Sequence, residues 1–275
     1  MATKRIVTVF GATGSQGGSV AKYLLEDGTF AVRAVTRNAE SPAAQGMCCN
    51  GAEIVIADLN KPETLPATVK GSYGVSGVTD SEFAQGKALV DAAKTAGVQH
   101  FVWWYVHRRD TSRHDTSDAE SVDEYLKASG IPRTSLFNSA YFENLVSPVS
   151  GFQMCKKQDD GTISVEIPSP ADSYMPFYSV DQTGGWVLEA LKHPDKWIGK
   201  DMHAIGQHIT PRQIANTIGK LTGKTTVLKS SATVEEFRMM GMSDNPVVKE
   251  LYLNLKCVSR IASDNVLIGH VQLLL

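Results

Sequence analysis

The first 38 residues contain an order of segments that severely restricts how the chain can fold. A short apolar run at residues 6–10 leads directly into a glycine turn at residues 11–17, and residues 15–27 have the composition of a helix. A second apolar run follows at residues 30–36. This order predicts a strand, a turn, a helix and a second strand in one unit, and in that context glycines at the turn indicate dinucleotide binding.

Each glycine of the turn has its own physical role in this hypothesis. Gly11 allows the tight turn, Gly14 lets the backbone approach a pyrophosphate, and Gly17 lets the helix pack close to the strand. The amide groups of the turn and the positive end of the helix dipole would face the phosphates. The candidate cofactor contacts in the turn are therefore Gly11, Thr13, Gly14, Ser15, Gln16 and Gly17.

The end of the second strand indicates which dinucleotide would bind. NAD-binding units carry an Asp or Glu about 20 residues beyond the glycines, whereas this chain has Arg37 and Asn38 there. A guanidinium is a rigid fork of donors, so Arg37 favours the 2′-phosphate of NADP(H). The alternative is a solvated arginine at a strand end. We take Arg37, Asn38 and Asp58, the acid that closes the third apolar run, as further candidate contacts.

The alternation of strands and helices continues after this unit. Apolar runs predict strands at residues 53–58, 74–79, 100–106 and 134–137, with helices ending near residue 69 and spanning residues 83–96 and 121–129. Alternation of this kind predicts an α/β fold, a Rossmann-type doubly wound parallel sheet.

In the second half of the chain, prolines and glycines divide the sequence into shorter pieces. Helical signals return at residues 180–192, 211–221 and 233–240. We predict an NADP-binding Rossmann-type domain over residues 1–147 and a smaller C-terminal α/β lobe over residues 148–275. This lobe would form the far wall of the cleft, and its first helix would pack back on the sheet.

Composition excludes several classes of function. The net charge of −2 does not provide the basic surface that nucleic-acid binding needs, and no apolar run approaches the ~18 residues of a membrane span. The four cysteines have no zinc or C-x-x-C spacing, so we expect reduced thiols in a cytoplasmic protein. Entry into the nucleus stays open for a chain of this size. For the adjacent pair Cys48-Cys49, redox sensing and inert thiols are the two alternatives.

Several segments resemble the NmrA-like proteins, which are atypical short-chain dehydrogenase/reductases. They are Gly11-Ala-Thr-Gly-Ser-Gln-Gly-Gly, Val35-Thr-Arg-Asn, Gln85-Gly-Lys-Ala-Leu, Asp123-Glu-Tyr-Leu, Ser129-Gly-Ile-Pro and Ala140-Tyr-Phe-Glu-Asn-Leu. The resemblance covers about residues 4–240 and is nearest to the animal NmrA-like NADPH-sensor proteins. It implies a Rossmann-type fold, NADP(H) binding and, often, loss of dehydrogenase activity. Such members report the redox state of the cofactor to protein partners.

The resemblance also implies cofactor contacts outside the turn. It places Lys87 near the nicotinamide side of the cleft, and Tyr141, Phe142 and Asn144 against the nicotinamide ribose and ring. The alternative for Lys87 is a solvated lysine on a helix. For the other three residues it is ordinary packing and helix capping.

Catalysis in short-chain reductases uses a Tyr-x-x-x-Lys pair on the helix after the fifth strand. The only literal match, Tyr252 with Lys256, lies far beyond that helix, and Tyr105 with Arg109 begins inside the strand itself. The lysine that related reductases carry before residues 123–125 is absent, and so is the family serine at the end of the fifth strand. We therefore assign no catalytic residue and no metal ligand, and predict a regulator without dehydrogenase turnover. The alternative is an NADPH-dependent reductase of a small carbonyl or quinone, with Tyr141 or a bound water as the acid.

Partners are expected to be proteins, and a homodimer stays open. The basic cluster His107-Arg-Arg with Arg113 and His114 is either a solvated loop, a docking surface for an acidic partner or a second contact to the cofactor phosphates. Residues 71–83, 103–118 and 258–275 depart from the family pattern. An altered transcript or decayed gene copy that cannot bind the cofactor is therefore a third interpretation.

Overall fold

Strands and helices alternate through the first half of the chain, as predicted. The computed structural model describes residues 3–77, 83–105, 118–147, 153–231, 233–244, 248–249 and 252. The strands of the first half are β1 (Ile6–Val9), β2 (Ala31–Thr36), β3 (Glu53–Ile56), β4 (Ser72–Gly77), β5 (His100–Tyr105) and β6 (Arg133–Asn138). The helices are α1 (Ser15–Asp27), α2 (Pro42–Cys49), α3 (Leu65–Val69), which follows a 3₁₀ turn at Pro62–Thr64, α4 (Phe83–Thr95) and α5 (Asp118–Ser129).

The second half contains shorter strands. They are β7 (Ala140–Tyr141), β8 (Cys155–Lys157), β9 (Ile163–Pro170), β10 (Met175–Tyr178), β11 (Lys200–Ala204), β12 (Gln207–Ile209) and β13 (Thr226–Ser231). The helices are α6 (Thr183–Lys192), α7 (Pro194–Trp197), α8 (Pro211–Thr222) and α9 (Val234–Met240), with 3₁₀ turns η2 (Phe142–Leu145) and η4 (Val180–Gln182). The longer helices match those predicted from the spacing of apolar residues, whereas most of these strands carry no such signal.

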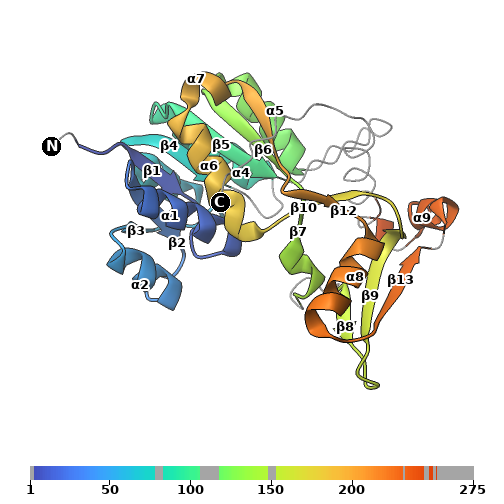
Figure 1. Ribbon diagram of the computed structural model, residues 1–275. Coiled ribbons are helices and arrows are strands. Elements are labelled where there is room, and N and C mark those ends of the chain that lie inside the picture. The colour runs from blue at the N-terminus through green and yellow to red at the C-terminus, as the bar shows by residue number, and fades with distance from the viewer. Residues whose placement is uncertain are drawn as a thin grey trace.

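The main body is a seven-stranded sheet with helices on both faces (Figure 1). Its strand order is β11-β6-β5-β4-β1-β2-β3, and each neighbouring pair is parallel. This confirms the predicted Rossmann-type doubly wound parallel sheet. The seventh strand, β11, was not predicted; it comes from the second half of the chain and pairs with β6 along its whole length.

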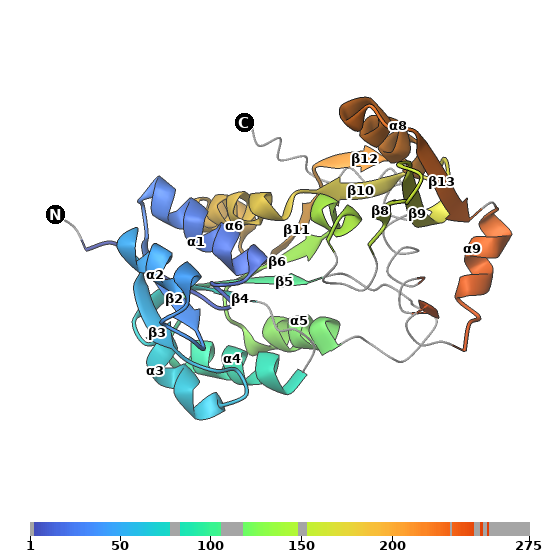
Figure 2. The same cartoon turned by 90° about the horizontal axis from the view of Figure 1, so that it is seen from below.

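Two apolar layers hold the helices on the sheet. Figure 2 shows α1 and α6 on one face and α3, α4 and α5 on the other. Ser19 on α1 is hydrogen-bonded to the start of α6 and to the 3₁₀ turn before it. The Gly184 amide donates to Ser19 Oγ at 2.9 Å, and Ser19 Oγ donates to the Asp181 carbonyl at 2.6 Å. A helix of the second half therefore lies directly against the helix that follows the glycine turn.

The smaller sheets lie outside the main body. One has the order β12-β10-β7, and the other, β13-β9-β8, forms a C-terminal lobe together with α8 and α9 (Figure 1). The apolar core of the lobe includes Val165 and Ile214, and Phe177 of β10 packs into the same core. Helix α8 begins with a capping box, in which Gln213 N donates to Thr210 Oγ1 at 3.1 Å and Thr210 N donates to Gln213 Oε1 at 2.9 Å.

Helix α2 is an addition to the predicted elements. Its start is capped by Ser41, whose hydroxyl oxygen accepts from the Ala44 amide at 3.3 Å, and Pro42 occupies the first turn. The helix has only eight residues and contains Gly46, a poor helix former. It is therefore too short to show a recognisable helical spacing of apolar residues.

Some predicted features fall outside the described residues. These are the basic cluster at residues 107–114, the tail at residues 258–275, and the end of the predicted fourth strand at residues 78–79. Among the helices that the structure describes, none is both long enough and apolar enough to cross a membrane.

Candidate cofactor cleft

A cleft of about 560 Å³ opens where β1, β2 and β3 end. Its lining residues are Phe10, Gly11, Thr13, Gly14, Ser15, Gln16, Gly17, Val35, Thr36, Arg37, Ala57, Asp58, Leu59, Asn60 and Gln85. The six predicted residues of the glycine turn, Arg37 and Asp58 are all among them. The structure therefore brings together two sets of candidate contacts that are far apart in the sequence.

The glycine turn has the geometry that the sequence predicts. Gly11 has a φ of +64°, which L-residues with side chains rarely adopt. A Cβ atom on Gly17 would overlap the backbone of Gly11 and would lie 2.9 Å from Ala12 N. Helix α1 starts after Gly14 without a side-chain cap. Because the first amides of a helix have no intrahelical acceptor, the start of α1 offers free N–H donors to the cleft.

Arg37 lies at the end of β2 and is exposed. Its guanidinium makes no hydrogen bond or ion pair to any other residue within the described ranges. The loop that follows is well fixed, since Asn38 N donates to Thr36 Oγ1 at 3.1 Å and Glu40 N donates to Asn38 Oδ1 at 2.9 Å. The Asn38 side chain thus stabilises the loop, and Asn38 is not among the residues that line the cleft.

The opposite wall of the cleft begins at Asp58. Asp58 Oδ1 accepts from Asn60 N at 3.0 Å, and Asn60 Oδ1 accepts from Gln85 Nε2 at 2.7 Å. These two bonds tie the loop after β3 to helix α4. Asn60 and Gln85 line the cleft although the sequence pattern did not single out either as a contact.

Lys87 is engaged on the surface of α4. Its Nζ lies 2.7 Å from Asp91 Oδ2 and 4.8 Å from the centre of the Tyr125 ring, and Tyr125 Oη donates to Asp91 Oδ1 at 2.6 Å. The bond to Asp91, followed by the contact with Tyr125, raises the pKa of Lys87 above its usual value. Lys87 does not line the cleft, so its cofactor contact stays a prediction beside the alternative of a surface lysine.

The segment Tyr141–Asn144 also lies apart from the lining of this cleft. The Tyr141 hydroxyl is buried and has no hydrogen-bond partner in the described part of the chain, and burial raises the pKa of Tyr141 to about 12. Phe142 stacks on Phe177, with ring centres 5.2 Å apart. The role of this segment at the nicotinamide therefore stays a prediction.

Two long-range contacts, one of them to the glycine turn, had no signal in the sequence. The indole N–H of Trp104, a fully buried residue on β5, donates to Gln16 Oε1 at 2.6 Å. Glu143 accepts from Ser179 Oγ at 2.5 Å and from the Val180 amide at 3.0 Å. Both contacts join segments that are distant in sequence, so only the folded chain could reveal them.

Tyr252, the tyrosine of the literal Tyr-x-x-x-Lys match, lies against the C-terminal lobe. Its ring centre is 5.0 Å from that of Phe237 on α9. It therefore does not lie on the helix after β5, where reductases carry their catalytic tyrosine. The described ranges also contain no group of His, Cys, Asp and Glu side chains that could hold a metal ion.

The parallel sheet, the glycine turn and the uncapped start of α1 define a Rossmann-type protein with a cleft at the glycine turn. Within that class the chain belongs to the NmrA-like family, whose sequence pattern matches residues 3–265.

Relatives of known sequence cover most of the chain. It is 28% identical over 272 residues to the NmrA-like family domain-containing oxidoreductase hkm9 of Aspergillus hancockii, covering 88% of this chain and 80% of that protein. It is 30% identical to the oxidoreductase cpsB of Aspergillus campestris, over 81% and 74% of the two chains.

Solved structures share the fold. NmrA, described as a negative transcriptional regulator and crystallised with NAD, has a TM-score of 0.77 at 20% identity, over 95% of this chain and 84% of that one. The NADP complex of NmrA has a TM-score of 0.74 at the same identity and the same coverage. The triphenylmethane reductase of a Citrobacter species, complexed with NADP(H), has a TM-score of 0.68 at 22% identity, over 93% and 90% of the two chains.

Proposed function

We propose that this protein binds NADP(H) in the cleft and acts as a regulator that reports the redox state of the cofactor to protein partners, without dehydrogenase turnover. The observation that carries the proposal is Arg37, an exposed residue that follows β2 and lines the glycine-turn cleft, and whose guanidinium has no partner among the described residues. A cation at this position complements a 2′-phosphate, whereas the carboxylate typical of NAD-binding units would repel it.

The donors of the cleft fit this cofactor. The free amides at the start of α1 would bind the pyrophosphate, with the hydroxyl groups of Thr13 and Ser15 beside them. Arg37 would bind the 2′-phosphate through two parallel hydrogen bonds. The proposed cofactor would therefore have its pyrophosphate at the start of α1 and its 2′-phosphate at Arg37.

The described residues give little support for proton transfer. A tyrosine that acts as a general acid needs a pKa near the working pH, whereas burial raises the pKa of Tyr141 to about 12. Lys87 is paired with Asp91, and Tyr252 lies against the lobe. NADPH supplies a hydride in reductases, but a sensor needs only two conformations with different affinities for the cofactor. Its partner would be another protein or a second copy of this chain.

The second candidate is an NADPH-dependent reductase of a small carbonyl or quinone. The relatives hkm9 and cpsB carry the name oxidoreductase, and a triphenylmethane reductase shares the fold. A soft acceptor such as a quinone can take a hydride with little acid–base help, so the high pKa of Tyr141 does not exclude it.

The first test is calorimetric titration with NADPH, NADP⁺ and NADH. NADPH is expected to bind more tightly than NADH, and Arg37→Ala to weaken NADPH binding by about 10- to 100-fold, because a hydrogen bond to a charged group contributes ~1.5–3 kcal/mol. NADH binding should not change. Arg238→Ala on the exposed surface of α9 is the matched control. Equal affinity for NADH and NADPH in the unsubstituted protein would contradict the proposed preference.

A second assay separates the two candidate functions. NADPH oxidation is followed with a panel of quinones and small aldehydes, using protein that has passed the binding test. The regulator is expected to bind NADPH and to give no oxidation above the protein-free rate. Multiple turnover that Arg37→Ala reduces would establish the reductase instead.

A further inference from the structure

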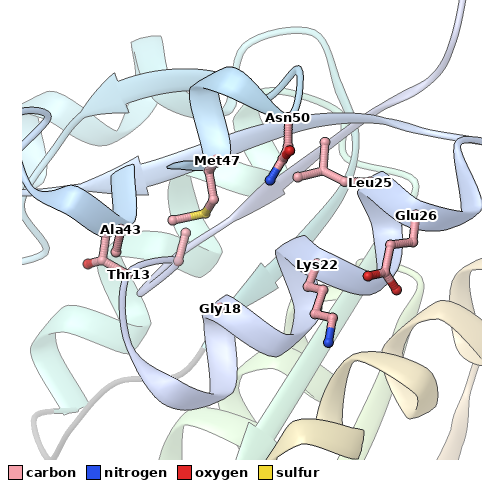
Figure 3. Close-up of a pocket in the computed structure, with 9 residues that line it drawn as sticks. Thr13, Gly18, Lys22, Leu25, Glu26, Ala43, Met47 and Asn50 are labelled. Atoms are coloured by element: carbon pink, nitrogen blue, oxygen red, sulfur yellow. The ribbon is translucent and has the colours of Figure 1, made fainter. Parts of the chain in front are cut away.

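A second cavity lies on the other side of the glycine turn. It has a volume of about 430 Å³. Figure 3 shows it between α1 and α2, with Met47 on α2 and Asn50 just after α2 facing Leu25 on α1. Thr13 lines both this cavity and the cofactor cleft. A change in the last turn of α2 would therefore alter the wall of this cavity, to which Thr13 of the glycine turn also contributes.

Two free thiols occupy that last turn. Cys48 and Cys49 are adjacent in sequence, both exposed, and directly between Met47 and Asn50. Cys155 differs from them, because it is buried and burial raises its pKa to about 11. Since the thiolate is the reactive form and must be reached by the reagent, Cys48 and Cys49 are far better placed to react than Cys155.

We propose that Cys48 and Cys49 form a thiol–disulfide exchange site for small disulfides such as glutathione disulfide, and that oxidation of this pair weakens cofactor binding. One thiolate attacks the small disulfide and releases one thiol, and its neighbour then attacks the mixed disulfide and releases the second. Two S–H groups of the protein become one S–S bond, while two electrons and two protons convert one small disulfide into two thiols.

The helix cannot keep its shape when this bond forms. A disulfide needs its two Cβ atoms about 3.5–4.5 Å apart, and consecutive residues of a helix do not face each other. Bonds that close the end of α2 join Asn50 N to the Gly46 carbonyl at 3.2 Å, Gly51 N to the Cys48 carbonyl at 2.9 Å and Ala52 N to the Met47 carbonyl at 3.0 Å. Oxidation would break this turn and displace Met47 and Asn50 from the cavity wall.

The other end of α2 contacts the loop that carries Arg37. Gln45 Nε2 donates to the Ala39 carbonyl at 2.8 Å, and Ser41 N donates to the Asn38 carbonyl at 3.4 Å. A distorted α2 would thus loosen the Arg37 loop from one side and the glycine turn from the other. This coupling rests on the proposed NADP(H) function, whereas the exchange reaction itself does not.

The test equilibrates the full chain with glutathione and glutathione disulfide at graded ratios. On oxidation, the mass of the peptide that contains Cys48 and Cys49 is expected to decrease by two hydrogen atoms. Amide hydrogen exchange over residues 42–52 is expected to become faster. The Kd for NADPH should rise about tenfold, which corresponds to ~1.4 kcal/mol. The double variant Cys48→Ser/Cys49→Ser should bind NADPH like the reduced protein at every ratio, with Cys155 still present as an internal control.

Three results would overturn the proposal. One is a peptide that carries only a glutathione adduct, a second is a disulfide at Cys48-Cys49 with unchanged affinity for NADPH, and a third is an equal response in the double variant. If the reduced protein binds no dinucleotide, the proposed function fails instead. The mass and the amide exchange then still decide whether the thiol pair forms a disulfide and unwinds α2.

Discussion

At the scale of single residues, the glycine turn depends on how closely α1 approaches the end of β1. The turn brings Gly17 so near to Gly11 and Ala12 that no side chain fits between them. Because the free amides of α1 have to point at one place in the cleft, this close approach determines the position of the donors.

Replacing Gly17 with alanine is expected to push α1 away from the turn. Overpacking of this kind costs ~1–3 kcal/mol, and the displaced helix start would also bind NADPH more weakly. Gly46→Ala on α2 is the matched control, because a Cβ atom there meets nothing within 4 Å and alanine is favoured in a helix by roughly 0.5–1 kcal/mol. Urea unfolding should show opposite shifts, and a Gly17→Ala protein of unchanged stability would refute this account.

Two neighbouring tryptophans allow a similar comparison. Trp103 and Trp104 are both fully buried. Among the described residues, the indole N–H of Trp104 donates to Gln16 in the glycine turn, whereas the indole N–H of Trp103 has no acceptor. Trp104→Phe should therefore weaken NADPH binding several-fold, since a typical hydrogen bond contributes ~0.5–1.5 kcal/mol. Trp103→Phe should leave NADPH binding unchanged. Calorimetric titration of both variants with NADPH measures the two affinities. Equal losses of affinity would mean that the packing of the indole rings matters, and not the hydrogen bond to Gln16.

At the scale of elements, β5 and β6 are joined by side chains as well as by the backbone. His100 Nε2 lies 2.9 Å from Thr134 Oγ1, and Thr134 Oγ1 donates to the Trp197 carbonyl at 2.9 Å. His100 is fully buried, and desolvation lowers its pKa from 6.5 to about 4. The folded protein therefore keeps this imidazole neutral at pH values where the unfolded chain already binds a proton.

This difference predicts a loss of stability in mild acid. As the pH falls below 6.5, the unfolded state takes up the proton first, so the free energy of unfolding should fall by about 1.4 kcal/mol per pH unit until the pH nears 4. His100→Asn removes this dependence. Urea unfolding at pH 7, 6 and 5 measures it as the difference between the two proteins. A constant difference across this range would contradict the assigned pKa.

Elements with a strong local signal could be predicted from the sequence. Helices α1, α4, α6 and α8 have apolar residues at helical spacing, and the strands of the first half are apolar runs bounded by turns. Helix α2 is too short for such a signal. Strands β8, β12 and β13 are half exposed, and they form because of partners elsewhere in the chain, which local spacing does not reveal.

At the scale of the whole molecule, some residues of the candidate site could be predicted from the sequence, and others depend on contacts between distant segments. The glycine turn and Arg37 could be predicted because a known spacing relates them, and the structure brings them to one cleft. Asn60 and Gln85 on the opposite wall could not, since their bond joins the loop after β3 to helix α4 and no known spacing relates the two. Lys87 and the segment at Tyr141 were assigned through family resemblance, and neither lines the described cleft.

The strand β11 has a consequence for how the chain folds during synthesis. It completes the central sheet next to β6, yet Lys200 follows Asn138 by 62 positions in the sequence (200 − 138). At ~5–20 residues per second, a ribosome needs about 3–12 s to add them. During that interval β6 is an open edge and the face that α6 will cover is bare. We therefore expect the nascent chain to be most exposed to pairing with other chains until residue 204 has emerged.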